Sequence, residues 1–288
     1  MADAGPTQSN PRTCLLCTVP RSGSWLLADL LEQTEVAGRP EEYFRPDYRA
    51  AWSRELGVPA RTPYRTYIKA ALEKTSTPNG VFSAKLHWYQ LEWVCARLRT
   101  LTRSKPGASD AELIAQWLPE PHYVHLQRED TARQAISYYR AAYSDNWFDL
   151  VEDDVVAAEP RLIRPIPMPP EPDWEHVRFL EDVVITHGLR WTEYFARSGI
   201  VPLPIRYEDL VDSPTDTILR VLDFIGITPP PDMELPVPRL KKQADAETER
   251  LLEQYLPLRE EIQPRQLDLK DSRKATDPRP LHPVATGQ

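Results

Sequence analysis

The stretch from Thr13 to Gln33 constrains the fold of this 288-residue chain more than any other. It begins with an apolar run that stops at Pro20, which predicts a short buried strand over residues 13–19. A loop of small residues follows, and four leucines then recur at helical spacing (Leu26, Leu27, Leu30 and Leu31). A strand, a tight loop and a helix in this order form the first half of a βα unit. We therefore expect an α/β fold.

The rest of the chain continues this alternation. Further strands are predicted over residues 81–86, 123–126 and 201–207. Further helices are predicted from about Thr131, over 174–197 and from Ser213-Pro214, where Ser213 is the expected capping residue. The two prolines within 201–207 favour an edge strand. Alternating strands and helices predict a central, mostly parallel sheet flanked by helices.

We expect residues 13–263 to form a single domain. Residues 1–12 are a polar leader that we expect to be disordered, and residues 264–288 are a polar tail without periodicity that we expect to be mobile. Residues 145–173 are acidic and rich in proline, which predicts a long loop that acts as a lid or an acceptor-side insert. The alternative is that this insert serves a partner protein.

Composition excludes several classes of protein. Thirty-five basic against 43 acidic residues give a net charge of −8, which argues against binding nucleic acid through phosphate contacts. No apolar run approaches the roughly 20 residues of a membrane span, so no membrane insertion is expected. The N-terminus has no apolar export signal and three cysteines cannot form a disulfide framework, so a cytoplasmic location is expected. Cys14 and Cys17 point to opposite faces of a strand, and we expect a site without a metal ion.

The loop from Pro20 to Ser24 has the chemistry of an anion site. Backbone N–H groups at a helix N-terminus stabilise an anion, Arg21 adds a full charge, and Ser22 and Ser24 add hydroxyl donors. The alternative is a tight turn without a ligand. The nucleotide-binding pattern GxxxxGK[ST] occurs nowhere in the chain, which disfavours a kinase or ATPase of that class.

Residues 18–27 resemble the 5′-phosphosulfate loop of sulfotransferases, which use 3′-phosphoadenosine 5′-phosphosulfate (PAPS). Together with Gly38-Arg-Pro-Glu-Glu-Tyr-Phe44, they resemble the bacterial Stf0 family. Other segments agree with that family in order: residues 78–82 leading to 85–88, then 134–139, 207–210 and 242–245. The resemblance covers most of residues 13–260. It implies a P-loop-like three-layer sulfotransferase fold, PAPS as the sulfuryl donor, and a homodimer.

The resemblance also implies a role for individual residues. The residues implied to bind PAPS are Arg21, Ser22, Gly23, Ser24 and Trp25 at the 5′-phosphosulfate, Arg128 and Ser137 at the 3′-phosphate, and Lys242 in the later motif. An arginine fork suits a phosphate dianion, whereas Lys242 replaces an arginine and loses that bidentate geometry. Lys85 and Arg21 would contact the transferring sulfonate. Arg133 is interpreted as a surface charge rather than as a second phosphate ligand.

Two residues are candidates for the general base. Glu42 matches the catalytic glutamate of the family pattern, and we expect partial desolvation beside two aromatic residues to raise its pKa. His87 fits the Lys-Thr-His string of the eukaryotic-type cytosolic enzymes, and an imidazole is well tuned near pH 7. We rank Glu42 first. The plainer alternatives are a carboxylate that pairs with Arg39 or Arg45, and a histidine that packs beside Trp88.

The acceptor implied is a hydroxylated small molecule, with trehalose, a glycolipid and a glycosylated natural product as candidates. Its candidate ligands are Arg39, Tyr43, Trp88 and Tyr138. Arg39 replaces an acidic residue near the sugar of the trehalose enzyme, which counts against trehalose itself. Aromatic residues at helical spacing are also typical of a core. The rival functions are a kinase-like phosphoryl transferase and a nucleotide-binding protein without catalytic activity.

Overall fold

The computed structural model describes residues 11–101, 107–144, 146–147, 168–234, 236–239 and 245–263. The chain divides into two compact units. The first comprises Met1–Glu129 and Gly188–Arg239, and the second comprises Asp130–His187 and Leu240–Gln288. The expectation of a single domain over 13–263 stays a prediction. Residues 1–10, most of the proposed insert (145 and 148–167) and the tail 264–288 lie outside the described residues.

Within the described part of the first unit, one sheet has four strands in the order β2-β1-β3-β4. The strands are β1 (Arg12–Thr18), β2 (Val81–His87), β3 (Pro121–Gln127) and β4 (Leu203–Arg206). Every neighbouring pair is parallel, which confirms the predicted sheet, and β4 lies at an edge as its prolines indicated. The β1–β2 register places Leu16 opposite Lys85 and Thr18 opposite His87.

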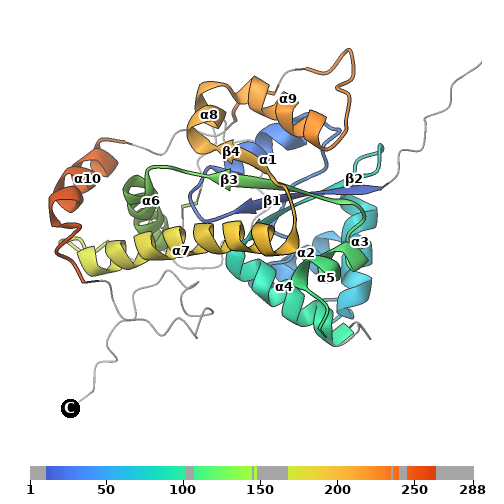
Figure 1. The fold of residues 1–288 in the computed structure, drawn as a ribbon, viewed down its shortest axis with the longest axis horizontal. Helices are drawn as coiled ribbons and strands as arrows, with labels where there is room; N and C mark the ends of the chain where they lie inside the picture. The colour runs from blue at the N-terminus through green and yellow to red at the C-terminus, as the bar shows by residue number, and fades with distance from the viewer. Residues whose placement is uncertain are drawn as a thin grey trace, which may run out of the picture. The chain divides into compact units, whose positions relative to one another are not determined.

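Helices cover both faces of this sheet. Cys14 and Leu16 belong to a buried apolar cluster that includes residues of α1 (Ser24–Gln33) and α9 (Pro214–Phe224). On the opposite face, His125 contacts Phe195 of α7 (Trp174–Ser198). Figure 1 shows α1 and α9 on one side of the strands and α4 (Trp88–Leu101) on the other. The predicted three-layer α/β fold is therefore confirmed.

The remaining helices of the first unit were not predicted individually from the sequence. They are η1 (Pro46–Tyr48), α2 (Arg49–Glu55), α3 (Tyr64–Thr75), α5 (Asp110–Trp117) and α8 (Tyr207–Asp212). Two local expectations need correction. Arg12, assigned to the leader, is the first residue of β1, because it pairs with Val81 of β2 and its backbone N–H donates to the carbonyl of Gly80 (3.1 Å). Ser213 precedes α9, but its side chain makes no capping hydrogen bond.

The second unit contains α6 (Thr131–Ser144), the first part of α7, and α10 (Ala246–Leu258). A fully buried carboxylate, Glu181 of α7, holds these helices together. It accepts hydrogen bonds from Thr131 of α6 (2.8 Å), Tyr255 of α10 (2.7 Å) and Arg259 just beyond α10 (2.6 Å). These partners compensate the cost of burying the charge.

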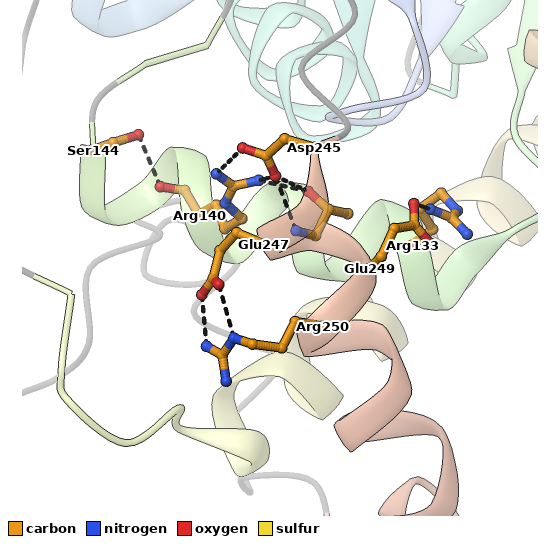
Figure 2. Close-up of polar contacts among 8 residues, drawn as sticks. Arg133, Arg140, Ser144, Asp245, Glu247, Glu249 and Arg250 are labelled. Carbon is orange, nitrogen blue, oxygen red and sulfur yellow. Dashed lines mark hydrogen bonds and ion pairs between the residues drawn. The ribbon is translucent and has the colours of Figure 1, made fainter.

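Ion pairs on the outside of this unit also join α6 to α10 (Figure 2). Arg140 donates to both carboxylate oxygens of Asp245, which in turn caps α10 by accepting from the backbone N–H of Thr248 (2.9 Å). Arg133 pairs with Glu249, and this agrees with its interpretation as a surface charge. Across the described residues, no helix is both long enough and apolar enough to cross a membrane.

Candidate active site

The loop after β1 leads into α1 without a side-chain cap on the backbone N–H groups of the helix N-terminus. Arg21 and Gly23 both have positive φ (63° and 88°), and α1 begins at Ser24. The cap position forms no side-chain hydrogen bond, and the first turn of α1 has no acidic residue. The positive end of the helix dipole is therefore not neutralised by a carboxylate of its own first turn, which favours an anionic ligand.

Ser22 adds a donor inside this loop. Its side chain is fully buried, and among the described residues its Oγ has no hydrogen-bond partner. A buried hydroxyl left unpaired costs free energy, and native structures rarely tolerate it without a reason. An anion held by the loop is such a reason, because it would accept the hydrogen bond of Ser22.

Arg128 lies directly beyond β3, at the same edge of the sheet as this loop. Its guanidinium donates to the carbonyl oxygen of Arg21 (3.2 Å) and lies 4.5 Å from the ring centroid of Tyr207. The ring of Tyr207 also packs against Gly23 so closely that a Cβ there would overlap it. Tyr207 thus supports both the loop and the arginine that sequence reasoning assigned to a phosphate.

Lys85 is a fully buried cation on β2. Its Nζ lies 3.2 Å from Oε1 of Glu42 and 3.2 Å from the ring centroid of Trp25, at the start of α1. A buried ammonium group is stable only when its lost hydration is compensated, here by a carboxylate and an aromatic face. The sequence named Lys85, Glu42 and Trp25 separately, and the structure brings them together.

Glu42 is also buried, and its two oxygens have different neighbours. Oε1 faces Lys85 and lies 3.5 Å from Nε2 of His87. Oε2 accepts a hydrogen bond from Nε2 of Gln90 (2.6 Å) and lies 3.4 Å from Arg45. Four side chains that can donate a hydrogen bond thus surround one carboxylate.

These neighbours reverse the expected shift of the Glu42 pKa. Burial alone would raise it, but the charge of Lys85, the hydrogen bond with His87 and the charge of Arg45 hold the pKa of the Glu42 carboxyl well below its usual value. The expectation of a raised pKa was wrong because it considered the adjacent aromatic residues and not Lys85, which lies 43 positions later in the chain. Glu42 is therefore an ionised carboxylate in this structure.

The structure brings His87 next to Glu42 as well. Its Nδ1 lies 2.8 Å from the hydroxyl oxygen of Thr18, and its Nε2 faces Glu42. The segment that carries Glu42 is fixed to β2 by the backbone, since the N–H of Lys85 donates to the carbonyl of Glu41 (2.9 Å). Both candidate bases and the candidate sulfonate ligand therefore form one cluster.

The candidate acceptor residues of the first unit are less accessible than expected. Tyr43 is buried, donates its hydroxyl to the carbonyl of Arg39 (3.0 Å), and packs against Trp52 and Phe82, as a core residue does. Arg39 is surrounded by three carboxylates, those of Glu32, Glu41 and Glu55. Trp88 is half-buried and makes edge contacts with Trp191 and Tyr194.

The remaining candidates lie elsewhere in the chain. Ser137 and Tyr138 belong to α6 of the second unit, where Tyr138 is buried and contacts Trp147. Lys242 lies outside the described residues. Sequence reasoning assigned no role to Gln90 and none to Tyr207. Tyr207 was part of a matching motif, whereas Gln90 carried no signal beyond its place three residues after His87.

Replacing Gly23 by alanine should destabilise the protein. The positive φ and the overlap with Tyr207 predict a loss of about 1–3 kcal/mol in the free energy of unfolding, measured by urea denaturation. Gly188→Ala is the matched control, because Gly188 lies inside α7 with no atom within 4 Å of an added Cβ. It should stabilise by about 0.5–1 kcal/mol. Equal effects of the two substitutions would contradict the loop geometry.

The Stf0 sulphotransferase family matches residues 13–257. Trehalose 2-sulfotransferase of Mycobacterium tuberculosis is 28% identical over 279 residues, covering 85% of this chain and 94% of that protein. Trehalose 2-sulfotransferase of Mycolicibacterium smegmatis is 26% identical over 277 residues, covering 85% and 95%.

Similar solved structures include a sulfotransferase from Alicyclobacillus acidocaldarius. Its TM-score is 0.44 at 14% sequence identity, and the match covers 86% of this chain and 92% of that chain. Another is the sulfotransferase domain from the curacin biosynthetic pathway, with a TM-score of 0.44 at 16% identity over 85% and 98%. The family match spans most of the chain and agrees with the sequence prediction: this chain belongs to the Stf0 sulphotransferase family and is a sulfotransferase.

Proposed function

We propose that this enzyme transfers the sulfuryl group of PAPS to a hydroxyl of a small, sugar-bearing acceptor. The observation that carries the proposal is the cluster around residues 20–24. There the N-terminus of α1, the buried hydroxyl of Ser22 and the cations of Arg21 and Arg128 belong to one loop and its neighbour. Lys85 lies against the ring of Trp25 at the start of α1 and pairs with an ionised glutamate. Such a set fits a phosphosulfate anion beside a proton acceptor.

The donor-side residues have separate tasks. Bound PAPS supplies an electrophilic sulfur, whose bond to the 5′-phosphate oxygen breaks as the acceptor oxygen bonds to it. The loop N–H groups, Ser22 and Arg21 hold the 5′-phosphosulfate and stabilise the charge that develops on the leaving oxygen. Arg128 holds the 3′-phosphate through its guanidinium fork. Ser137 stays a separate candidate for a phosphate ligand. Trp25 and Lys242 complete the proposed donor-binding set.

Glu42 is the proposed general base. A carboxylate only accepts hydrogen bonds, so Nε2 of His87 carries the proton that faces Glu42, and Nδ1 accepts from the hydroxyl of Thr18 (2.8 Å). In this tautomer neither ring nitrogen has a lone pair available for an acceptor. His87 therefore orients Glu42, and Oε1 of Glu42 takes the proton of the acceptor hydroxyl.

The pKa of Glu42 is low because Lys85 pairs with its carboxylate in this structure. A carboxylate with a low pKa is a weak base. When the ammonium group of Lys85 turns to a sulfonate, it contributes less to stabilising the ionised form of Glu42. The base strength of Glu42 then rises as the donor site fills, which coordinates proton removal with sulfuryl transfer.

Hydroxylated carbohydrates are the proposed acceptor class, and trehalose is the first compound to test because two relatives carry it in their names. Trp88 and Arg39 stay candidate acceptor ligands, whereas burial counts against a direct contact of Tyr43 or Tyr138 with the acceptor. Homodimer formation and a cytoplasmic location are likewise part of the proposal.

Calorimetric titration with 3′-phosphoadenosine 5′-phosphate tests the donor site. The wild type should bind with micromolar affinity, and ATP with Mg²⁺ should bind far more weakly. Arg128→Ala should weaken binding about tenfold or more, because a charge-assisted bidentate contact is lost, and Arg128→Lys should fall between the two. Arg197→Ala, at an exposed position of α7, is the control. Folded wild-type protein that does not bind would refute the proposal.

Glu42→Gln and His87→Ala distinguish the two candidate bases. With saturating donor, Glu42→Gln should lower kcat about 10²–10⁴-fold, since an amide cannot accept the proton, whereas His87→Ala should lose at most about tenfold. Retained binding of 3′-phosphoadenosine 5′-phosphate shows that each variant keeps its donor site. The reverse ranking of the two kcat values would assign the proton transfer to His87.

A further inference from the structure

Gln90 is a fully buried amide in the first turn of α4, and each of its hydrogen-bonding groups is used. Its Nε2 donates to Oε2 of Glu42 (2.6 Å) and to the hydroxyl oxygen of Tyr89 (3.2 Å). Its Oε1 accepts from the backbone N–H of His87 (3.0 Å). One side chain thus connects the end of β2 to the segment that carries Glu42.

This connection separates the two oxygens of Glu42. Oε2 is taken by Gln90 and lies near Arg45 (3.4 Å), while Oε1 is directed to Lys85 (3.2 Å) and His87 (3.5 Å). A carboxylate held at a single oxygen would still rotate about its last side-chain bond. Contacts on both oxygens fix that rotation, and they leave Oε1 on the side of the proposed sulfonate ligand.

We propose that Gln90 is a positioning residue for sulfuryl transfer, which anchors Oε2 of Glu42 so that Oε1 meets the acceptor hydroxyl. The inference rests on the proposed function, in which Glu42 takes the proton. A base misplaced by about 1 Å can cost about 10²-fold in rate, so an anchor of this kind acts on kcat.

The chemistry of the amide fits this task better than a charged group would. A second cation at position 90 would stabilise the carboxylate further and weaken it as a base, and a second carboxylate would repel it. The neutral amide supplies a short hydrogen bond without a net charge. It also ties the position of Glu42 to the backbone of His87, two residues after Lys85.

Gln90→Leu and Gln90→Glu test the proposal, with Gln33→Leu as the control. Gln33 is the last residue of α1, and its side chain bonds Asp29 and the backbone of Val237 rather than the Glu42 cluster. We would measure kcat and KM for transfer from PAPS to trehalose over pH 5.5–9. We would also titrate the ¹³Cδ resonance of Glu42, assigned with Glu42→Gln, because this readout needs no acceptor. Binding of 3′-phosphoadenosine 5′-phosphate checks the donor site.

Gln90→Leu should lower kcat about 10–100-fold with little change in KM, and should raise the pKa of Glu42, because the ionised carboxylate loses a donor. Gln90→Glu should regain activity toward low pH, where the two carboxyl groups share one proton and reproduce the wild-type charge, and lose it as pH rises. Gln33→Leu should behave as wild type in both readouts.

An unchanged Glu42 titration in Gln90→Leu, or a Gln90→Glu profile parallel to that of the wild type, would overturn the proposal. If Gln90→Leu does not fold, the pH profile and the Glu42 titration of Gln90→Glu decide the question in the same way. Absence of donor binding by the wild type would count against the proposed function alone, since the titration of Glu42 reports on Gln90 without donor or acceptor.

Discussion

The buried ion pair between Lys85 and Glu42 is the interaction on which the site depends. Neither side chain is stable alone in this interior, because each would lose its hydration without compensation. The pair forms because the backbone of Glu41 bonds that of Lys85, which brings the loop after Gly38 onto β2. Around it, the ring of Trp25 covers the ammonium group, and Gln90 holds the far oxygen of the carboxylate. The low pKa of Glu42 is a consequence of this arrangement and not a property of its loop.

The parallel sheet explains why these groups come from distant parts of the chain. The loop of residues 20–24 follows β1, His87 ends β2, and Arg128 follows β3. The carboxyl ends of parallel strands lie at one edge of a sheet, which is where ligands of open α/β proteins bind. A helix N-terminus and two cations at that edge provide the charge that a phosphosulfate requires. Lys85, two residues before the end of β2, pairs with Glu42.

Much of the fold and of the candidate site was predictable from the sequence, and each wrong or missing prediction has a physical cause. The strands, α1, α6, α7 and the loop after β1 followed from apolar periodicity and from glycine and proline positions, and motifs named Lys85, Glu42 and His87. The pairing of Lys85 with Glu42 depends on β2 lying beside that loop, so the pKa of Glu42 was predicted in the wrong direction. Gln90 contacts Glu42, Tyr89 and the backbone of His87, and no local sequence pattern predicts these three contacts. Tyr43 was predicted to contact the acceptor, but it is buried in the core.

Transfer of radioactive sulfur from [³⁵S]PAPS tests the central claim most directly. The enzyme would be incubated with trehalose and a panel of other hydroxylated carbohydrates, with [γ-³²P]ATP and Mg²⁺ in parallel reactions. The account predicts that ³⁵S appears on at least one acceptor together with an equal amount of 3′-phosphoadenosine 5′-phosphate, and that Lys85→Met greatly reduces this transfer. Transfer of ³²P in place of ³⁵S, or a Lys85→Met enzyme as active as the wild type, would contradict it.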